Sequence, residues 1–117
     1  MHKHILDAVY GSVIGGAIGD ALGAPVEGWY CQEIREKFGR VTDFSDTKRG
    51  NAPNGPGGVT DDTVLSLYVS LAIIRQQGRI TPDDLAQVWL EKGDNPHFWT
   101  NERLTLLKLQ AGMNPWD

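Results

Sequence analysis

Residues 4–23, HILDAVYGSVIGGAIGDALG, constrain the fold more than any other stretch of this chain. Their apolar residues recur at the spacing of an α-helix, and the alternation typical of a strand is missing. Gly11, Gly15, Gly19 and Gly23 fall four residues apart and form one stripe along the predicted helix. Because each interior glycine costs ~1 kcal/mol relative to alanine, the stripe needs a compensating contact. Close approach of another backbone, or of a ligand, would supply it.

The rest of the chain also favours helices, with about five in all, so the predicted fold class is all-α. Thr81 as N-cap, Pro82 at the first helical position and two acids in the first turn mark one helix start, and Gly93 marks its end. The other predicted elements are a helix stop at Pro25, a short helix in residues 31–39, a long Gly/Pro-rich loop at 40–59, a helix from near Thr60 to about Gln77, and a helix in residues 100–112.

Length and composition restrict the classes of function. The 117 residues suffice for one small domain, predicted over residues 1–117, or for part of a larger one. A net charge of −4 gives no general attraction to a nucleic acid polymer or to an anionic membrane. Cys31 is the only cysteine, which excludes an internal disulfide and fits a reducing compartment. No signal peptide pattern is present, and the apolar run 9–22 is interrupted by Asp20 and too short to span a bilayer, so we expect a cytoplasmic protein.

The segment GPGGVTDDTVLSL, residues 55–67, places two adjacent carboxylates before a run that should be buried. In one interpretation Thr60 is an N-cap whose hydroxyl accepts from a backbone amide near Thr63. Asp61 and Asp62 then lie in the first turn, where the interaction of their negative charge with the helix dipole stabilises the helix by ~0.3–1 kcal/mol. In the other interpretation, the oxygens of these three consecutive residues bind a hard cation such as Mg²⁺. The two are compatible, since a capped helix start is a rigid place for ligands, but three donors are too few for a closed site.

Two further carboxylates lie in or just after the first predicted helix. Glu27, beside Gly28 in a tight loop, could be partly desolvated and act as an acid or base, and an exposed loop glutamate is the alternative. Asp20 interrupts an apolar face, and a buried aspartate must be hydrogen-bonded or paired. It would therefore hold a neighbouring loop in place or take part in a site.

Two motifs, GSVIGGAIGDALGAPVEGW and, about thirty residues later, GGVTDDTVLSL, together resemble the start of a known family. The family is the ADP-ribosylglycohydrolases of the dinitrogenase reductase-activating glycohydrolase type, and the resemblance covers residues 5–115. It implies an all-α fold with a two-metal site, usually of Mg²⁺ and sometimes of Mn²⁺. It also implies a hydrolase of the N- or O-glycosidic bond that joins ADP-ribose to a protein side chain or small acceptor.

The same resemblance implies roles for single residues. It implies that Thr60, Asp61 and Asp62 are metal ligands. It implies that Glu27 lies in the catalytic loop, near the scissile bond or the metal-bound water, and that Asp20 gives structural support. It further implies that Gly57 and Gly58 bind substrate, within a 40–59 loop that lies over the ribose.

The chain departs from the family pattern in length. Members are longer, and a later motif resembling Gly-Asp-Ala-Asp-Thr, which supplies the remaining metal ligands, is absent from these residues. The chain therefore resembles the N-terminal part of such an enzyme, and we expect a complementary C-terminal chain or self-association to cover its apolar helix faces. Two alternatives stay open: a non-catalytic ADP-ribose-binding or structural protein, since some members of the wider family serve as lens crystallins, and an inactive fragment.

Overall fold

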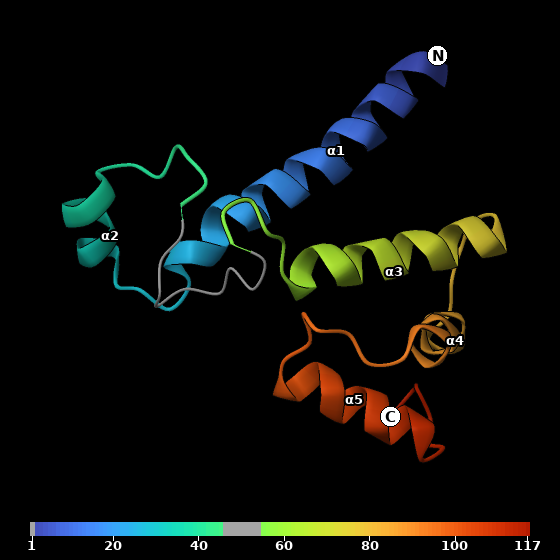
Figure 1. The fold of residues 1–117 in the computed structure, drawn as a ribbon. Helices are drawn as coiled ribbons and strands as arrows, with labels where there is room; N and C mark the ends of the chain where they lie inside the picture. Colours follow the sequence, from blue (N-terminus) through green and yellow to red (C-terminus); the bar gives the residue numbers. More distant parts are fainter. Residues whose placement is uncertain (1, 46–54) are drawn as a thin grey trace. The chain divides into compact units, whose positions relative to one another are not determined.

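A computed structural model describes residues 2–45 and 55–117 and shows an all-α protein (Figure 1). The predicted fold class is thereby confirmed, with five α-helices and no strand in the described ranges. The elements are α1 (His2–Gly23), a 3-10 turn η1 (Ala24–Val26), α2 (Cys31–Phe38), α3 (Asp61–Gln76), α4 (Pro82–Lys92) and α5 (Thr100–Gln110). The chain divides into two compact units, Met1–Thr63 and Val64–Asp117, which we call the first and second unit.

The helix boundaries follow the signals in the sequence closely. Thr81 caps α4, with Pro82 first in the helix and Gly93 just past its end at a φ of 67°, as predicted. The helix stop predicted at Pro25 is also confirmed, since α1 ends at Gly23 and Pro25 lies in the 3-10 turn η1 that follows. Of the predicted loop at 40–59, the described part carries neither helix nor strand, and residues 46–54 lie outside the described residues.

The second unit holds an aromatic core. Tyr68 from α3 and Phe98 from the segment between α4 and α5 are buried, and Trp89 of α4 packs against both. The Trp89 and Phe98 rings are stacked at 5.2 Å between centroids, and Tyr68 meets each of them edge-on. Aromatic pairs of this kind contribute ~0.5–1.5 kcal/mol each beyond their buried area, so these rings hold the three segments together.

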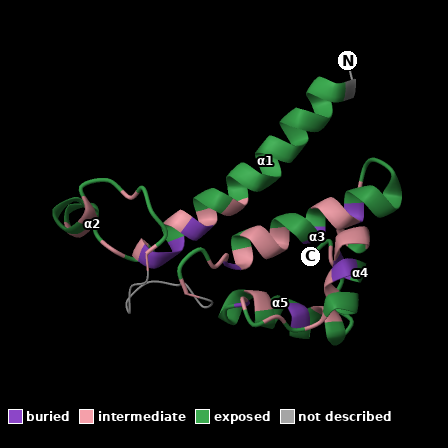
Figure 2. Ribbon diagram, turned by 45° about the horizontal axis from the view of Figure 1, so that its top comes forward, coloured by how far each residue is buried: buried purple, intermediate pink, exposed green. Residues whose placement is uncertain are grey.

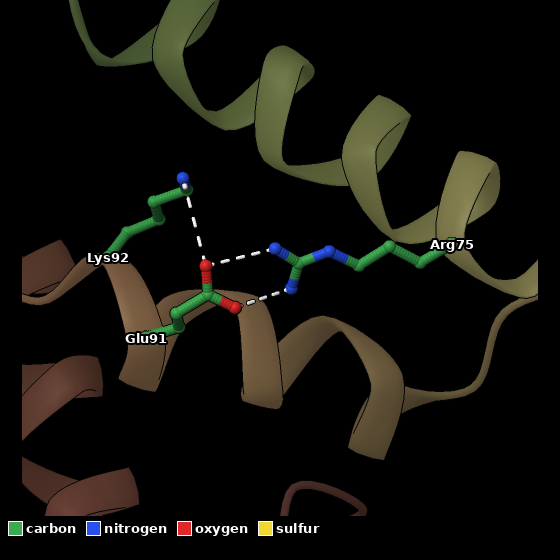
Figure 3. A network of polar contacts seen from close by, with 3 residues as sticks. All are labelled: Arg75, Glu91 and Lys92. Carbon is green, nitrogen blue, oxygen red and sulfur yellow. Dashed lines mark hydrogen bonds and ion pairs between the residues drawn. The ribbon is translucent and has the colours of Figure 1, made fainter.

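An ion pair joins α3 to α4 on the surface of the second unit (Figure 3). The Arg75 guanidinium donates to both carboxylate oxygens of Glu91, at 2.6 and 2.9 Å. Lys92 lies 3.9 Å from the same carboxylate. Because both side chains of the Arg75–Glu91 pair are about half exposed, we expect this contact to fix the helix pairing rather than to stabilise it strongly.

The first unit is buried mainly where the end of α1 meets η1. Ala21, Ala24 and Pro25 are buried there, whereas α1 is exposed over most of its length (Figure 2). A Cβ built on any glycine of the α1 stripe would meet no atom of another described segment within 4 Å. The described residues therefore do not make the compensating contact that the stripe predicts.

A segment longer than the apolar run 9–22 has the properties of a candidate membrane span. Residues Lys3–Val26 have a mean hydropathy of 1.3 and are, by length and composition alone, long and apolar enough to cross a bilayer, so the prediction of no span considered too short a segment. One such helix near an N-terminus is weak evidence of a membrane span, because core helices of soluble proteins and signal sequences pass the same test. A cytoplasmic location stays a prediction.

Candidate functional site

Every site residue that the sequence predicts lies in the first unit. These residues come from three places: the last turn of α1, the turn after η1, and the glycine-rich approach to α3 with its first turn. In chain order they are Asp20, Glu27, Gly57, Gly58, Thr60, Asp61 and Asp62. One compact unit of the fold thus carries the whole predicted set.

Thr60 immediately precedes α3 and caps it. Its side chain is buried, with 5% of its surface exposed, and it is the buried polar residue of the described chain. Its hydroxyl accepts from the backbone N–H of Asp62 at 3.3 Å, so the capped amide is that of the second helical residue. Asp61 is half-buried and Asp62 exposed, both in the first turn, where negative charge suits the helix dipole.

The carboxylate of Asp20 reaches this helix start from the last turn of α1. Its Oδ2 accepts from the backbone N–H groups of Thr60 and Thr63, at 2.8 and 3.2 Å, and from the Thr63 hydroxyl at 2.5 Å. Its Oδ1 accepts from the Thr60 hydroxyl at 2.7 Å. Burial raises the pKa of Asp20, but these hydrogen bonds from Thr63 and Thr60 outweigh it and lower the pKa below its usual value.

Thr63 is the residue at this site that sequence reasoning missed. Both its amide and its hydroxyl donate to Asp20. The signal was present in the letters TDDT, because a threonine stands at the third helical position, where a capping box has an acidic or amide side chain. A helix start without an acid at that position must find its acceptor elsewhere in the chain.

Glu27 lies in the turn that follows η1. The backbone N–H of Glu27 donates to Ala24 at 3.4 Å and that of Trp29 to Val26 at 3.0 Å, while Gly28 adopts a φ of 73°. Glu27 is exposed, which agrees with the second of the two interpretations of this residue, the exposed loop glutamate, and not with partial desolvation. Glu27 follows Asp20 by seven residues, and the segment between them is the end of α1 and the 3-10 turn η1.

Gly57 and Gly58 belong to a tight turn before α3. The N–H of Gly58 donates to the carbonyl of Gly55 at 2.9 Å. Gly57 has a φ of 80°, a conformation that side-chain-bearing residues rarely adopt, and a Cβ there would lie 3.7 Å from the Phe44 ring. The turn therefore specifies glycine at position 57 for a backbone reason.

The donors at the start of α3 are of the type that Mg²⁺ and Mn²⁺ prefer. A hydroxyl and two carboxylates are hard oxygen ligands, and they come from three consecutive residues, Thr60, Asp61 and Asp62. Within residues 2–45 and 55–117, no group of three or more His, Cys, Asp or Glu side chains is placed to hold a metal ion. Thr60, Asp61 and Asp62 can therefore supply part of a metal coordination shell, and the other ligands would have to come from elsewhere.

A separate cavity lies in the second unit. Its volume is about 360 Å³, and α4, α5 and the residues after α5 line it, Leu85, Trp89, Lys108 and Met113 among them. None of the predicted site residues contributes to its walls.

Comparison with known proteins places this chain in a family. The family model for ADP-ribosylglycohydrolase matches residues 1–116. The chain belongs to the ADP-ribosylglycohydrolase family. This confirms the resemblance seen in the sequence, and it supports a glycohydrolase in general terms.

Two curated relatives also match this member of the ADP-ribosylglycohydrolase family. It is 32% identical over 80 residues to the uncharacterized protein YegU of Escherichia coli, which covers 66% of this chain and 24% of the relative. It is 39% identical over 62 residues to an uncharacterized protein of Archaeoglobus fulgidus, which covers 53% of this chain and 20% of the relative. The matched stretches thus span a quarter or less of the length of these relatives. No solved structure gives a significant match.

Proposed function

We propose that this chain is part of a metal-dependent hydrolase that removes ADP-ribose from a protein side chain or small acceptor by cleaving an N- or O-glycosidic bond. The chain belongs to a glycohydrolase family over nearly its whole length. The observation that carries the proposal is the start of α3, where Thr60, Asp61 and Asp62 present consecutive oxygen donors on a helix anchored by Asp20. A rigid set of hard ligands is what a catalytic Mg²⁺ or Mn²⁺ requires.

Thr60, Asp61 and Asp62 would hold the metal, in a site that accepts two ions. When bound, the metal would orient the ribose hydroxyls and lower the pKa of a water for attack at the anomeric carbon. Positive charge develops at that carbon as the glycosidic bond breaks. The negative charges of Asp61 and Asp62 would help to offset it.

Glu27 would carry the proton in this reaction. Its carboxylate is exposed in the turn after η1, so it can exchange protons with water and substrate. The buried Ala24 and Pro25 fix this turn on the end of α1, the helix that also bears Asp20. Gly57 and Gly58 would let the backbone come close to the ribose, because neither has a side chain to keep it away.

The remaining ligands would come from a complementary C-terminal chain or a second copy. Magnesium takes about six ligands in near-octahedral geometry, and the start of α3 offers fewer. Helix α1 also exposes large apolar side chains that a partner would cover: Ile5, Leu6, Val9, Tyr10, Val13, Ile14 and Ile18.

The proposal is tested with two substrates, an arginine-linked and a serine-linked ADP-ribosyl peptide. The chain is mixed with a C-terminal half that carries the Gly-Asp-Ala-Asp-Thr-like motif, with Mg²⁺ or with a chelator. We expect release of ADP-ribose only with Mg²⁺ and only from the mixture. Release that persists in chelator would overturn the metal assignment.

One observation favours the alternative of a chain that binds ADP-ribose or builds structure without turnover. The described residues lack a group of three metal-holding acids or imidazoles. Tight ADP-ribose binding by the mixture, with no release of ADP-ribose from either peptide, would select this alternative.

A further inference from the structure

Asp20 concentrates four hydrogen bonds on one carboxylate, divided unequally between its two oxygens. Oδ2 accepts three, two of them from backbone N–H groups of Thr60 and Thr63. Oδ1 accepts one, from the Thr60 hydroxyl at 2.7 Å. The backbone donors fix the position of the carboxylate, and Oδ1 then faces one movable hydroxyl proton.

This arrangement fixes where the Thr60 hydroxyl points. A hydroxyl has one proton and two lone pairs. The proton of the Thr60 hydroxyl goes to Asp20, and one lone pair accepts from the N–H of Asp62 at 3.3 Å. The proton is thus held away from any cation that Thr60, Asp61 and Asp62 would bind, and the second lone pair is left as the ligand.

The other helix starts show that this long-range contact is not needed for capping alone. At α2, α4 and α5 the N–H before the helix donates to an acid of the helix's own first turn: Glu33, Asp84 and Glu102. At α3 the acids stand at the first and second positions, and the capping acceptor is Asp20, 40 residues earlier. At α3 the capping carboxylate therefore belongs to another helix, α1, and the two acids of the first turn, Asp61 and Asp62, lie next to the cap.

We propose that Asp20 is a positioning residue, which holds the proton of the Thr60 hydroxyl away from the metal so that the oxygen can act as a ligand. This rests on the proposed function, because it concerns the same metal centre. Asp20 acts through Thr60 and is not itself a ligand. Thr63 has a different part: it anchors Oδ2 without touching the Thr60 hydroxyl.

Asparagine at position 20 separates positioning from simple support. Its carbonyl oxygen would take the place of Oδ2, because the two backbone donors there cannot turn away. Its NH₂ group would then stand in place of Oδ1 and donate to the Thr60 hydroxyl. That hydroxyl would have to turn its proton outward, toward the position of the cation. Asp20→Asn therefore keeps most of the anchor and reverses the one contact that the proposal concerns.

The experiment uses the whole chain, Mn²⁺ alone as the probe, and NMR line broadening of the amides of residues 60–63, which detects even weak binding. Circular dichroism checks the helix content of each variant. We expect Mn²⁺ to broaden these amides in the wild-type chain and Asp20→Asn to need roughly 10- to 100-fold more Mn²⁺ for the same broadening, as for other partners of metal ligands. Thr63→Val should lower the thermal midpoint but leave the broadening within about threefold of wild type, since it removes only one anchor of Oδ2.

A double-mutant cycle shows whether Asp20 acts through Thr60. Thr60→Val removes the ligand oxygen and should weaken Mn²⁺ binding as much as Asp20→Asn does. Combining the two should weaken it no further, whereas independent effects would multiply. Asp84→Asn, the matched change at the α4 cap, should leave Mn²⁺ broadening unchanged.

The possible failures are distinct. No Mn²⁺ broadening in the wild-type chain, either alone or mixed with the C-terminal half, would overturn the proposed metal centre, and the role of Asp20 with it. Broadening in Asp20→Asn equal to wild type, or multiplied losses in the double variant, would overturn the positioning role and leave the metal centre standing. If Asp20→Asn does not fold, Thr60→Val decides, because its unchanged broadening would also overturn the positioning role.

Discussion

The starts of α3 and α4 are built from nearly the same letters and are put to different uses. At α4, in TPDD, Thr81 donates its N–H and its hydroxyl to Asp84, both at 2.7 Å, and accepts from the Asp84 amide at 3.3 Å. At α3, in TDDT, Thr60 makes the same three kinds of contact, but the carboxylate is Asp20 of α1.

The difference lies in the position of one acid. An acid at the third helical position can fold back onto the cap, and Asp84 does so. In TDDT the acids occupy the first and second positions, and Thr63 occupies the third. At α3 the cap is therefore supplied by a carboxylate 40 residues away, whereas at α4 it is supplied by an acid of the helix's own first turn.

The largest effect should come from the acids that distinguish the two starts. Asp61→Ala and Asp62→Ala should each abolish metal-dependent release of ADP-ribose in the complemented assembly, with little loss of helix content, because each would remove a metal ligand. Asp83→Ala at α4 is the matched control and should leave the rate unchanged. Full activity in both α3 variants would leave capping as the sole role of these acids.

A large kinetic effect is expected at the residue that shares the α1–η1 corner with Asp20. Glu27→Gln keeps the shape of the side chain and removes the proton-transfer group. It should lower kcat by roughly 10²–10⁴-fold with little change in ADP-ribose affinity by calorimetry, since Glu27 would act in the chemical step. Lost affinity with an unchanged kcat would make Glu27 a ligand-positioning residue instead.

The two cap threonines should differ in their effect on stability. Thr60→Ala removes a buried hydroxyl bonded to a carboxylate and should cost about 2–3 kcal/mol in urea unfolding. Thr81→Ala, at an exposed local cap, should cost about 1 kcal/mol. Equal losses would mean that the contact with Asp20 adds nothing beyond an ordinary cap.

The smallest effect concerns the dependence of the α4 cap on pH. Hydrogen bonds from the Thr81 side chain and then its backbone lower the pKa of Asp84 from 3.8. A lowered folded-state pKa stabilises the fold above 3.8, and this contribution is lost as the pH falls through the folded value. Asp84→Asn should therefore flatten the loss of thermal stability below pH 3.8. If thermal stability fell with pH in Asp84→Asn as steeply as in the wild-type chain, the Thr81–Asp84 cap would contribute nothing to the acid sensitivity.

Sequence patterns predicted what is local in this molecule. Thr81 and Pro82 predicted the start of α4, and Gly93 predicted its end. The helical periodicity of residues 4–23 predicted α1. These signals could be read because caps and helical spacing depend on residues within one or two turns of each other. The contact of Asp20 with Thr60 and Thr63 leaves a weaker trace. The threonine at the third helical position in TDDT indicates that the cap lacks a local acid, but nothing in the sequence says which distant carboxylate replaces it.

The site was predicted in the same uneven way. The metal-ligand set at residues 60–62 and the acid Glu27 came from the family resemblance, and their roles stay predictions. The sequence left two interpretations of Glu27 open, a partly desolvated acid or an exposed loop glutamate, because burial depends on which segments fold over a loop; the structure shows the exposed one. Thr63 was missed because its importance appears only once Asp20 is seen beside it.

The distance between Asp20 and its partners has a consequence for the order of folding. The hydrogen bonds between Asp20 and Thr60 close a loop of 40 residues. The loss of chain entropy on closing such a loop disfavours the contact by roughly 3 kcal/mol. The α4 box closes over three residues and can form as soon as its own turn forms. The first turn of α3 should therefore be capped only after α1 has packed against it. This would be a late, non-local step in the folding of the first unit. A kinetic intermediate with α4 and α5 formed, but with the amides of residues 60–63 still exchanging freely, is the species that this topology predicts.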